Sequence, residues 1–209
     1  MRSEASADSH SGWRPRSGRR ARLAVLFLVA GAAVAAGEEP QAGGLDAWFP
    51  HLRVGIWVKV AGKRTPEGIL DATKIKILDG ELDEVEVESW VDSVDVVRMT
   101  VETALGVRVV ATSSTKLEGP KPQRLVSFAF LMAGDRVDVE GQLQKDGSLV
   151  AEDIEIEKSK RVHPDLEPEN KHELTSRIES IDAEKHRIVV MGVPVQLSES
   201  TKNKTPLLD

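Results

Sequence analysis

The stretch that decides the fold is Gly134 to Glu157, GDRVDVEGQLQKDGSLVAEDIEIE, because its plan occurs twice in the chain. An earlier stretch, Gly55 to Leu78, reads GIWVKVAGKRTPEGILDATKIKIL and aligns with it without a gap at an offset of 79 residues. In both copies apolar residues lie two apart and glycines bound the runs, a pattern typical of two paired strands joined by a short turn. The chain is therefore predicted to use one β-hairpin plan twice.

Each copy of the hairpin changes the phase of its apolar positions once. The parity of these positions changes around Thr73-Lys74, and again around Glu152-Asp153. One extra residue in the strand, a β-bulge, would bend it while both halves keep their apolar side chains inward, as closure of a small barrel requires. Upstream of the strands, Phe49 matches Phe128 at the same offset. We expect an apolar connector or helical turn there that plugs one end of a barrel.

A second repeat covers the rest of the chain. VDSVD at 91–95 matches IESID at 178–182, and the match resumes from 106–116 to 192–202, with the offset changing from 87 to 86 residues. One insertion or deletion in a turn explains the change, because turns tolerate length variation. In the first copy the pattern predicts three strands, Val85 to Asp95, Val97 to Ala104, and Val107 to Ser113, with Gly106 in a tight turn.

The order of these parts predicts the architecture. Residues 47–78 form a half-module of two strands, residues 84–158 form a complete barrel, and residues 172–205 form a half-module of three strands. Residues 159–171, which are rich in charge and contain two prolines, read as a solvated linker. Neither half would be stable alone in water. We therefore expect an all-β protein with two small five-stranded antiparallel barrels, one continuous and one assembled from the N- and C-terminal half-modules. Pairing between chains and poorly ordered terminal halves remain as alternatives.

The N-terminal residues 1–36 have the profile of a signal peptide. Five arginines between Arg14 and Arg22 precede a charge-free run of 14 residues, Leu23 to Ala36, which ends in small residues. A membrane span needs about 20 apolar residues, so this run is short for one. We expect cleavage after Ala36, a periplasmic or extracellular mature chain, and no integral membrane segment after cleavage. An uncleaved N-terminal anchor is the alternative.

The charge of the mature chain narrows the classes of partner. After residue 36 there are 22 basic and 32 acidic side chains, a net charge of −10 with neutral histidines. Nucleic-acid binding depends on cations that neutralise phosphates, so we expect no nucleic-acid partner. The chain contains no cysteine, which excludes disulfides, thiolate nucleophiles and Cys-ligated metals.

No combination of residues predicts catalysis. The histidines His51, His163, His172 and His186 lack metal-binding spacings, and we expect them to lie exposed on loops or strands. Acidic residues alternate with Val or Ile at 83–88 and 152–157, which predicts a solvent-facing side of the strands and not a calcium loop. By the same alternation, we expect Asp138 to tolerate a change to Asn. The sequence thus predicts no enzyme, no metal and no cofactor.

Tryptophan side chains are the best candidates for a binding surface. Strand alternation places Trp57 opposite Val58 and Val60, so Trp57 points outward and could be exposed; Trp90 is a second candidate. Aromatic rings on such barrels can stack on ligands. A buried structural role is the more common alternative for a Trp.

The complete unit resembles an uncharacterised bacterial family. The resemblance rests on the Val-Asp-Ser-Val-Asp opening, the Gly-Val-x-Val strand, Ser-Thr-Lys at 114–116, Ala-Gly-Asp-Arg-Val-Asp-Val-Glu-Gly at 133–141 and Asp-Gly-Ser-Leu-Val-Ala-Glu-Asp-Ile at 146–154. Members of that family are secreted, tandemly repeated OB-like five-stranded barrels, described only as a domain of unknown function. The unit also looks distantly like the periplasmic bacterial OB-fold family. The resemblance implies an OB-like barrel outside the cytoplasm and brings no catalytic residues.

Two classes of function follow from these patterns. The first is a non-enzymatic module of the cell envelope that binds a protein or a cationic ligand through a barrel face or strand edge. The second is an oligosaccharide- or small-solute-binding domain that uses an exposed Trp57 or Trp90 as a stacking platform. The sequence does not name the partner in either case.

Overall fold

The computed structural model describes residues 44–120 and 126–205, which belong to one compact unit. The predicted signal peptide lies outside the described residues. The described chain is nearly all β-structure, with one short helix, α1 (Leu45–Trp48), and two 3-10 turns, η1 (Phe49–His51) and η2 (Phe128–Phe130). Within this part of the chain, no helix is both long enough and apolar enough to cross a membrane.

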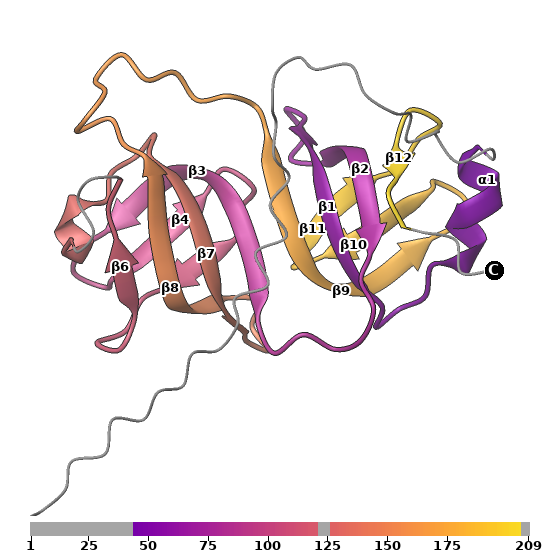
Figure 1. The fold of residues 1–209 in the computed structure, drawn as a ribbon, viewed down its shortest axis with the longest axis horizontal. Coiled ribbons are helices and arrows are strands. Elements are labelled where there is room, and N and C mark those ends of the chain that lie inside the picture. Colours follow the sequence, from indigo (N-terminus) through magenta and orange to yellow (C-terminus); the bar gives the residue numbers. More distant parts are fainter. Residues whose placement is uncertain (1–43, 121–125, 206–209) are drawn as a thin grey trace, which may run out of the picture. The chain divides into compact units, whose positions relative to one another are not determined.

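The continuous barrel is built from one uninterrupted part of the chain (Figure 1). Its five closing strands pair in the order β3-β4-β5-β8-β7 and back to β3, and only the β5–β8 pairing is parallel. A short sixth strand, β6, pairs with a later part of β8 than β5 does. The strands are β3 (Val85–Asp95), β4 (Thr100–Thr103), β5 (Arg108–Val110), β6 (Lys116–Glu118), β7 (Arg136–Leu143) and β8 (Leu149–Lys158).

The composite barrel combines strands from the two ends of the described chain (Figure 1). Its strands pair in the order β9-β10-β11-β2-β1 and back to β9, again with one parallel pairing, β11–β2. The strands are β1 (Trp57–Arg64), β2 (Leu70–Ile77), β9 (His172–Asp182), β10 (Arg187–Val190), β11 (Val193–Gln196) and β12 (Lys202–Asn203), which pairs with β2. The predicted fold class is confirmed: two closed five-stranded OB-like barrels, one continuous and one assembled from N- and C-terminal strands.

The predicted bulges occur at the expected places. In β1–β2 the register passes from Ala61↔Lys74 to Gly62↔Ala72, which leaves Thr73 unpaired. In β7–β8 the register skips Glu152 in the same way. At both bulges the partner strand comes so close to the glycine backbone that a Cβ on Gly62 or Gly141 would overlap a carbonyl oxygen. The bend of the strand therefore explains why both hairpins carry glycine at this position.

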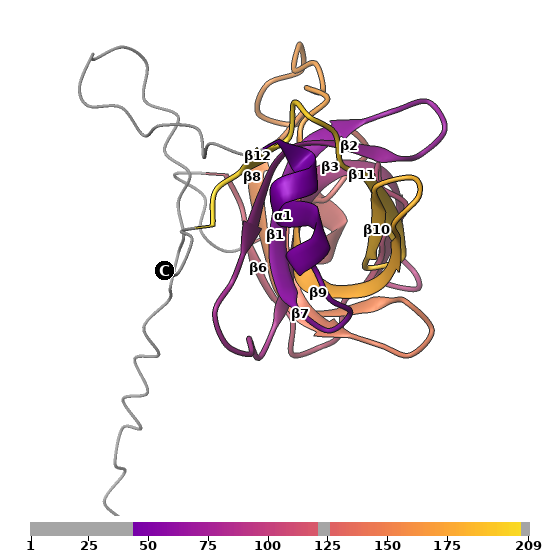
Figure 2. The same cartoon turned by 90° about the vertical axis from the view of Figure 1, so that its right-hand side faces the viewer.

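Alternate side chains of the strands fill the barrels. Val58 and Val60 of β1, like Val137 and Val139 of β7, are at most 1% exposed. Residues of α1 and η1 add to the same apolar core, and Figure 2 shows α1 across one end of the composite barrel. The expected apolar plug is thus present. The β3 bounds equal the predicted ones, whereas β4 and β5 are shorter than predicted because their ends are used in turns.

Candidate functional site

The two barrels are joined by backbone pairing between β3 and β9. Their antiparallel register runs Glu86↔Thr175, Val87↔Leu174 and Glu88↔Glu173. Val87 and Leu174 are also equivalent positions of the repeat, because they lie 87 residues apart. Two equivalent residues that face each other in an antiparallel pair define a local two-fold axis. The chain therefore contains, within itself, an interface of the kind that joins two identical subunits.

The outward side chains around this pairing form a largely acidic face. The registers place the outward positions of five adjacent strands, β8, β7, β3, β9 and β1, side by side in rows. We call this surface the acidic face; its carboxylates are Glu86, Glu88, Asp138, Glu140, Asp153, Glu155, Glu157 and Glu173, and Lys59, Arg136 and Arg177 lie among them. The expected polar side of these strands is thus present. It is shared by both barrels, which the sequence did not predict.

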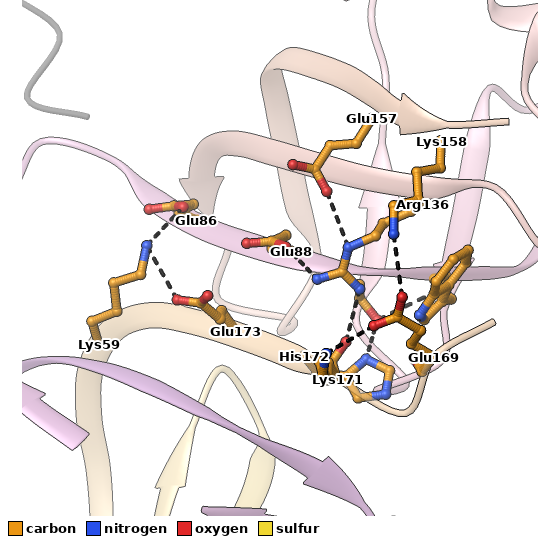
Figure 3. Close-up of polar contacts among 12 residues, drawn as sticks. Lys59, Glu86, Glu88, Arg136, Glu157, Lys158, Glu169, Lys171, His172 and Glu173 are labelled. Atoms are coloured by element: carbon orange, nitrogen blue, oxygen red, sulfur yellow. Dashed lines mark hydrogen bonds and ion pairs between the residues drawn. The ribbon is translucent and has the colours of Figure 1, made fainter. Parts of the chain in front are cut away.

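Arg136 is the best-connected cation of the acidic face (Figure 3). Its side chain, 10% exposed, forms an ion pair with Glu88 and donates through Nε to Glu157 at 3.0 Å. Its Nη1 donates to the backbone carbonyl of Lys171 at 2.8 Å, and the guanidinium lies 5.5 Å from the ring centre of Trp90. A planar, always charged group with several donors suits such a junction. Arg136 thus ties β3, β8 and the linker to β7.

Lys59 makes the corresponding bridge from the composite barrel. Its Nζ lies 3.1 Å from Glu86 and 3.5 Å from Glu173, and the side chain is 8% exposed (Figure 3). Burial alone lowers the pKa of Lys59, but the two carboxylates outweigh it and the net shift is upward. Because Glu86 belongs to the continuous barrel, this ion pair crosses the β3–β9 junction.

Asp138 is the most perturbed carboxyl group of the acidic face. It pairs with Glu88 on β3 and Glu155 on β8, and its Oδ1 is buried without a hydrogen-bond partner. Burial, followed by repulsion from Glu86, Glu88, Glu157 and Glu140, raises the pKa of Asp138 to about 8. The expectation that Asp138 is an ordinary solvent-facing residue is therefore wrong. Strand alternation placed it correctly outside the barrel, but neighbouring strands on the same face cover it.

His172 is a buried residue of the junction. It is 3% exposed, and its Nδ1 lies 2.9 Å from the hydroxyl of Ser89, which is fully buried. Burial, followed by the positive charges of Arg136 and Arg64, lowers the pKa of His172 to about 4. The imidazole is thus neutral at pH 7. The expectation that the histidines are exposed is wrong for this one, because β9 begins at the crossing point of the two barrels.

The other histidines lie away from the junction. His51 and His163 are exposed, and His186 is half-buried with its ring edge against Phe49, at 4.9 Å between ring centres. Within residues 44–120 and 126–205 no three acidic or histidine side chains converge in a way that could hold a metal ion.

Both candidate tryptophans are buried, so the expectation of an exposed stacking platform is wrong. Trp57 is 6% and Trp90 is 3% exposed. Trp57 does lie on the outer side of its strand, but Arg177, its cross-strand partner, covers the ring at 5.3 Å from the centre. Trp90 is covered by Arg136, and its indole N–H donates to the backbone carbonyl of Glu169 in the linker. An arginine thus covers each of these two tryptophans, which alternation alone cannot reveal.

The arrangement offers electrostatic recognition more readily than covalent chemistry. Ser89, which faces the only buried histidine of the described residues, is itself inaccessible to a substrate. The accessible part of the site consists of the exposed carboxylates at the β7–β8 side of the acidic face: Glu140, Glu155 and Glu157. A surface with one dominant charge attracts ligands of the opposite charge.

Comparison with protein families identifies the repeated unit. The family model described as "Domain of unknown function (DUF5666)" matches two segments, residues 27–76 and 84–155, which together make up more than half of the chain. The chain belongs to this family. The second DUF5666 segment includes nearly all strands of the continuous barrel, and the first includes β1 and most of β2. Comparison with curated proteins and with solved structures found no match.

Proposed function

We propose that the mature chain is a non-enzymatic module of the cell envelope that binds a cationic partner, such as a basic protein segment, through the acidic face. One observation carries this proposal: the carboxylates of β8, β7 and β3, joined by Glu173 of β9, lie in adjacent rows on one surface, in a chain whose net charge after residue 36 is −10. A surface on which negative charge dominates favours fast association with basic partners.

The proposal includes export of the chain from the cytoplasm. The arginine-rich N-terminus, the apolar run Leu23 to Ala36 and the small residues at its end support export and cleavage. N-terminal sequencing of the protein from a periplasmic or secreted fraction tests this step, and a mature start near Gly37 is the expected result. A chain that begins at Met1 in the cytosolic fraction would contradict it.

The alternative, a glycan-binding domain that uses exposed tryptophans, has lost its supporting observation because Trp57 and Trp90 are both buried. Soluble oligosaccharides should therefore leave the tryptophan fluorescence of the chain unchanged. Quenching by a defined oligosaccharide would restore this alternative.

Binding is tested by comparing two pairs of charge-removing substitutions. A lysine-rich model peptide should bind the wild-type chain, and the affinity should fall as salt is added. Glu140→Gln combined with Glu155→Gln, both exposed on the acidic face, should weaken binding several-fold. The matched control, Glu67→Gln combined with Glu184→Gln, removes the same charge from exposed turns elsewhere. Equal loss in both pairs would mean that total charge, and not this face, attracts the peptide. In-cell crosslinking with the same variants then identifies the natural partner.

A further inference from the structure

The junction between the barrels has fewer backbone pairs than the two antiparallel seams that flank it, β1–β9 and β3–β7. The β3–β9 register covers three residue pairs, whereas β1–β9 and β3–β7 each cover six. Opening the junction would break these three pairs and leave the ring of strands in each barrel closed, because neither ring includes the β3–β9 pairing. Side-chain contacts must therefore supply much of what holds β3 against β9.

One of these side-chain contacts can change its charge in mild acid. His172 begins β9, where it pairs with Gly62 of β1, and its ring reaches Ser89 of β3 in the other barrel. Its neighbour along the chain is the linker 159–171, which is exposed for most of its length and contains Pro164 and Pro168. Its last residues are held to the continuous barrel, because Arg136 donates to the carbonyl of Lys171 and the Trp90 indole donates to the carbonyl of Glu169. These two bonds must break before β9 can move away from β3, whereas the mostly exposed residues 161–168 can extend.

Charged groups reach the surroundings of His172 from every strand of the junction. Arg136 of β7 and Arg64 of β1 act on it directly as positive charges. The carboxylates nearby are already paired: Glu88 of β3 and Glu157 of β8 with Arg136, Glu173 of β9 with Lys59, and Glu169 of the linker with Lys158 and Lys171. A proton on His172 would thus place a third cation beside two arginines, in a site with almost no access to water.

We infer that the junction is an acid-sensitive latch, which stays closed while His172 is neutral and opens when His172 takes up a proton, with both barrels remaining folded. Opening separates β3 from β9 and exposes Ser89 and the inner part of the acidic face. An exported chain meets the pH of its surroundings, so such a latch would couple exposure of this surface to acidity.

The direction of the effect follows from the pKa of His172, which falls from an ordinary value of 6.5 to about 4 in the closed junction. The closed form is fully favoured above pH 6.5, and this advantage is lost as the pH falls from 6.5 towards 4. Over that window the closed-to-open ratio should drop by up to about 300-fold. Asp138 acts in the opposite direction, since its raised pKa favours the folded continuous barrel as the pH falls.

The latch is tested by a distance measurement between the barrels. The chain lacks cysteine, so Val97→Cys in the β3–β4 turn and Glu184→Cys in the β9–β10 turn can carry spin labels at two exposed, equivalent positions of the full chain. Pulsed electron resonance at a series of pH values between 7.5 and 4 gives the distribution of distances, and far-ultraviolet circular dichroism reports whether the strands persist.

We expect a narrow distribution at pH 7.5 that broadens below about pH 5 while the circular dichroism is unchanged. His172→Asn, which keeps a polar group near Ser89 but cannot take up the proton, should stay narrow at pH 4.5; His163→Asn, in the exposed linker, should behave like the wild type. If His172→Asn does not fold, Ser89→Ala serves instead, and it should shift the broadening to higher pH. A wild-type distribution that stays narrow at pH 4, or that broadens only together with loss of strand signal, would overturn the latch.

Discussion

Replacement of Asp138 by Asn should stabilise the protein at neutral pH. The carboxyl group lies between Glu88 and Glu155, its Oδ1 has no hydrogen-bond partner, and its pKa is raised from 3.8 to about 8. In the unfolded chain at pH 7 the group is ionised, whereas folding forces it to hold a proton. That difference corresponds to about 4 kcal/mol at pH 7. Asn removes this cost and can donate from its amide to the neighbouring carboxylates.

The net gain should be smaller, because the amide must also be buried. An imperfectly bonded amide costs about 1–3 kcal/mol, so we expect a net stabilisation on the order of 1–3 kcal/mol at pH 7. The stabilisation depends on pH, because the penalty of the raised pKa of Asp138 is absent below pH 3.8, grows as the pH rises towards 8, and is constant above. Asp138→Asn should therefore differ most from the wild type at pH 8.

Urea unfolding at pH 4, 6 and 8 measures this difference. The matched control is Asp71→Asn, an exposed aspartate on β2, which should leave the free energy of unfolding within about 0.5 kcal/mol of the wild type. If Asp138→Asn is no more stable than the wild type at pH 8, or if its advantage is as large at pH 4 as at pH 8, the electrostatic account of the acidic face is wrong.

Three further predictions concern the barrels. Val139→Asp should unfold the continuous barrel, because the side chain is 1% exposed and an unpaired buried carboxylate costs several kcal/mol, whereas Val97→Asp at a 95% exposed position should leave the melting temperature unchanged. Deletion of residues 172–209 should abolish hydrogen-exchange protection in residues 56–77, since β1 and β2 lose their partners; retained protection would contradict the composite barrel. Gly141→Ala should lower the melting temperature by several degrees, because the new Cβ meets a carbonyl oxygen of β8; an unchanged value would show that the bulge can relax.

The barrels were predictable from sequence because two independent repeats specify them. Val137 and Val139 share a parity with each other and with their equivalents in β1, and the closed barrel needs that parity. The bulge at Glu152 was visible as a phase change for the same reason. Even the composite barrel followed from the order of the half-modules, since neither half could bury its apolar face alone.

The junction was not predictable because alternation distinguishes only the inside of a barrel from its outside. Trp57 and Asp138 point outward and are covered by side chains of neighbouring strands, whereas His172, which shares the inward parity of Leu174, contacts Ser89 of the other barrel. The alternation of side chains along a strand does not show whether an outward side chain is covered by its neighbours. The contacts between the barrels depend in addition on the β3–β9 register, which consists of three residue pairs at sequence separations near 87.

The two-fold relation at the junction also explains the tryptophans. In the continuous barrel Trp90 on β3 pairs across strands with Arg136 on β7; at the equivalent place in the composite barrel, Arg177 on β9 pairs with Trp57 on β1. The two residue types have exchanged strands, yet each barrel keeps one guanidinium over one indole ring. Both barrels therefore keep an arginine stacked on a tryptophan at this position, on the outer side of the strands close to the junction. Trp57 and Trp90 therefore have a structural role, and a partner is better sought at the exposed carboxylates of β7 and β8.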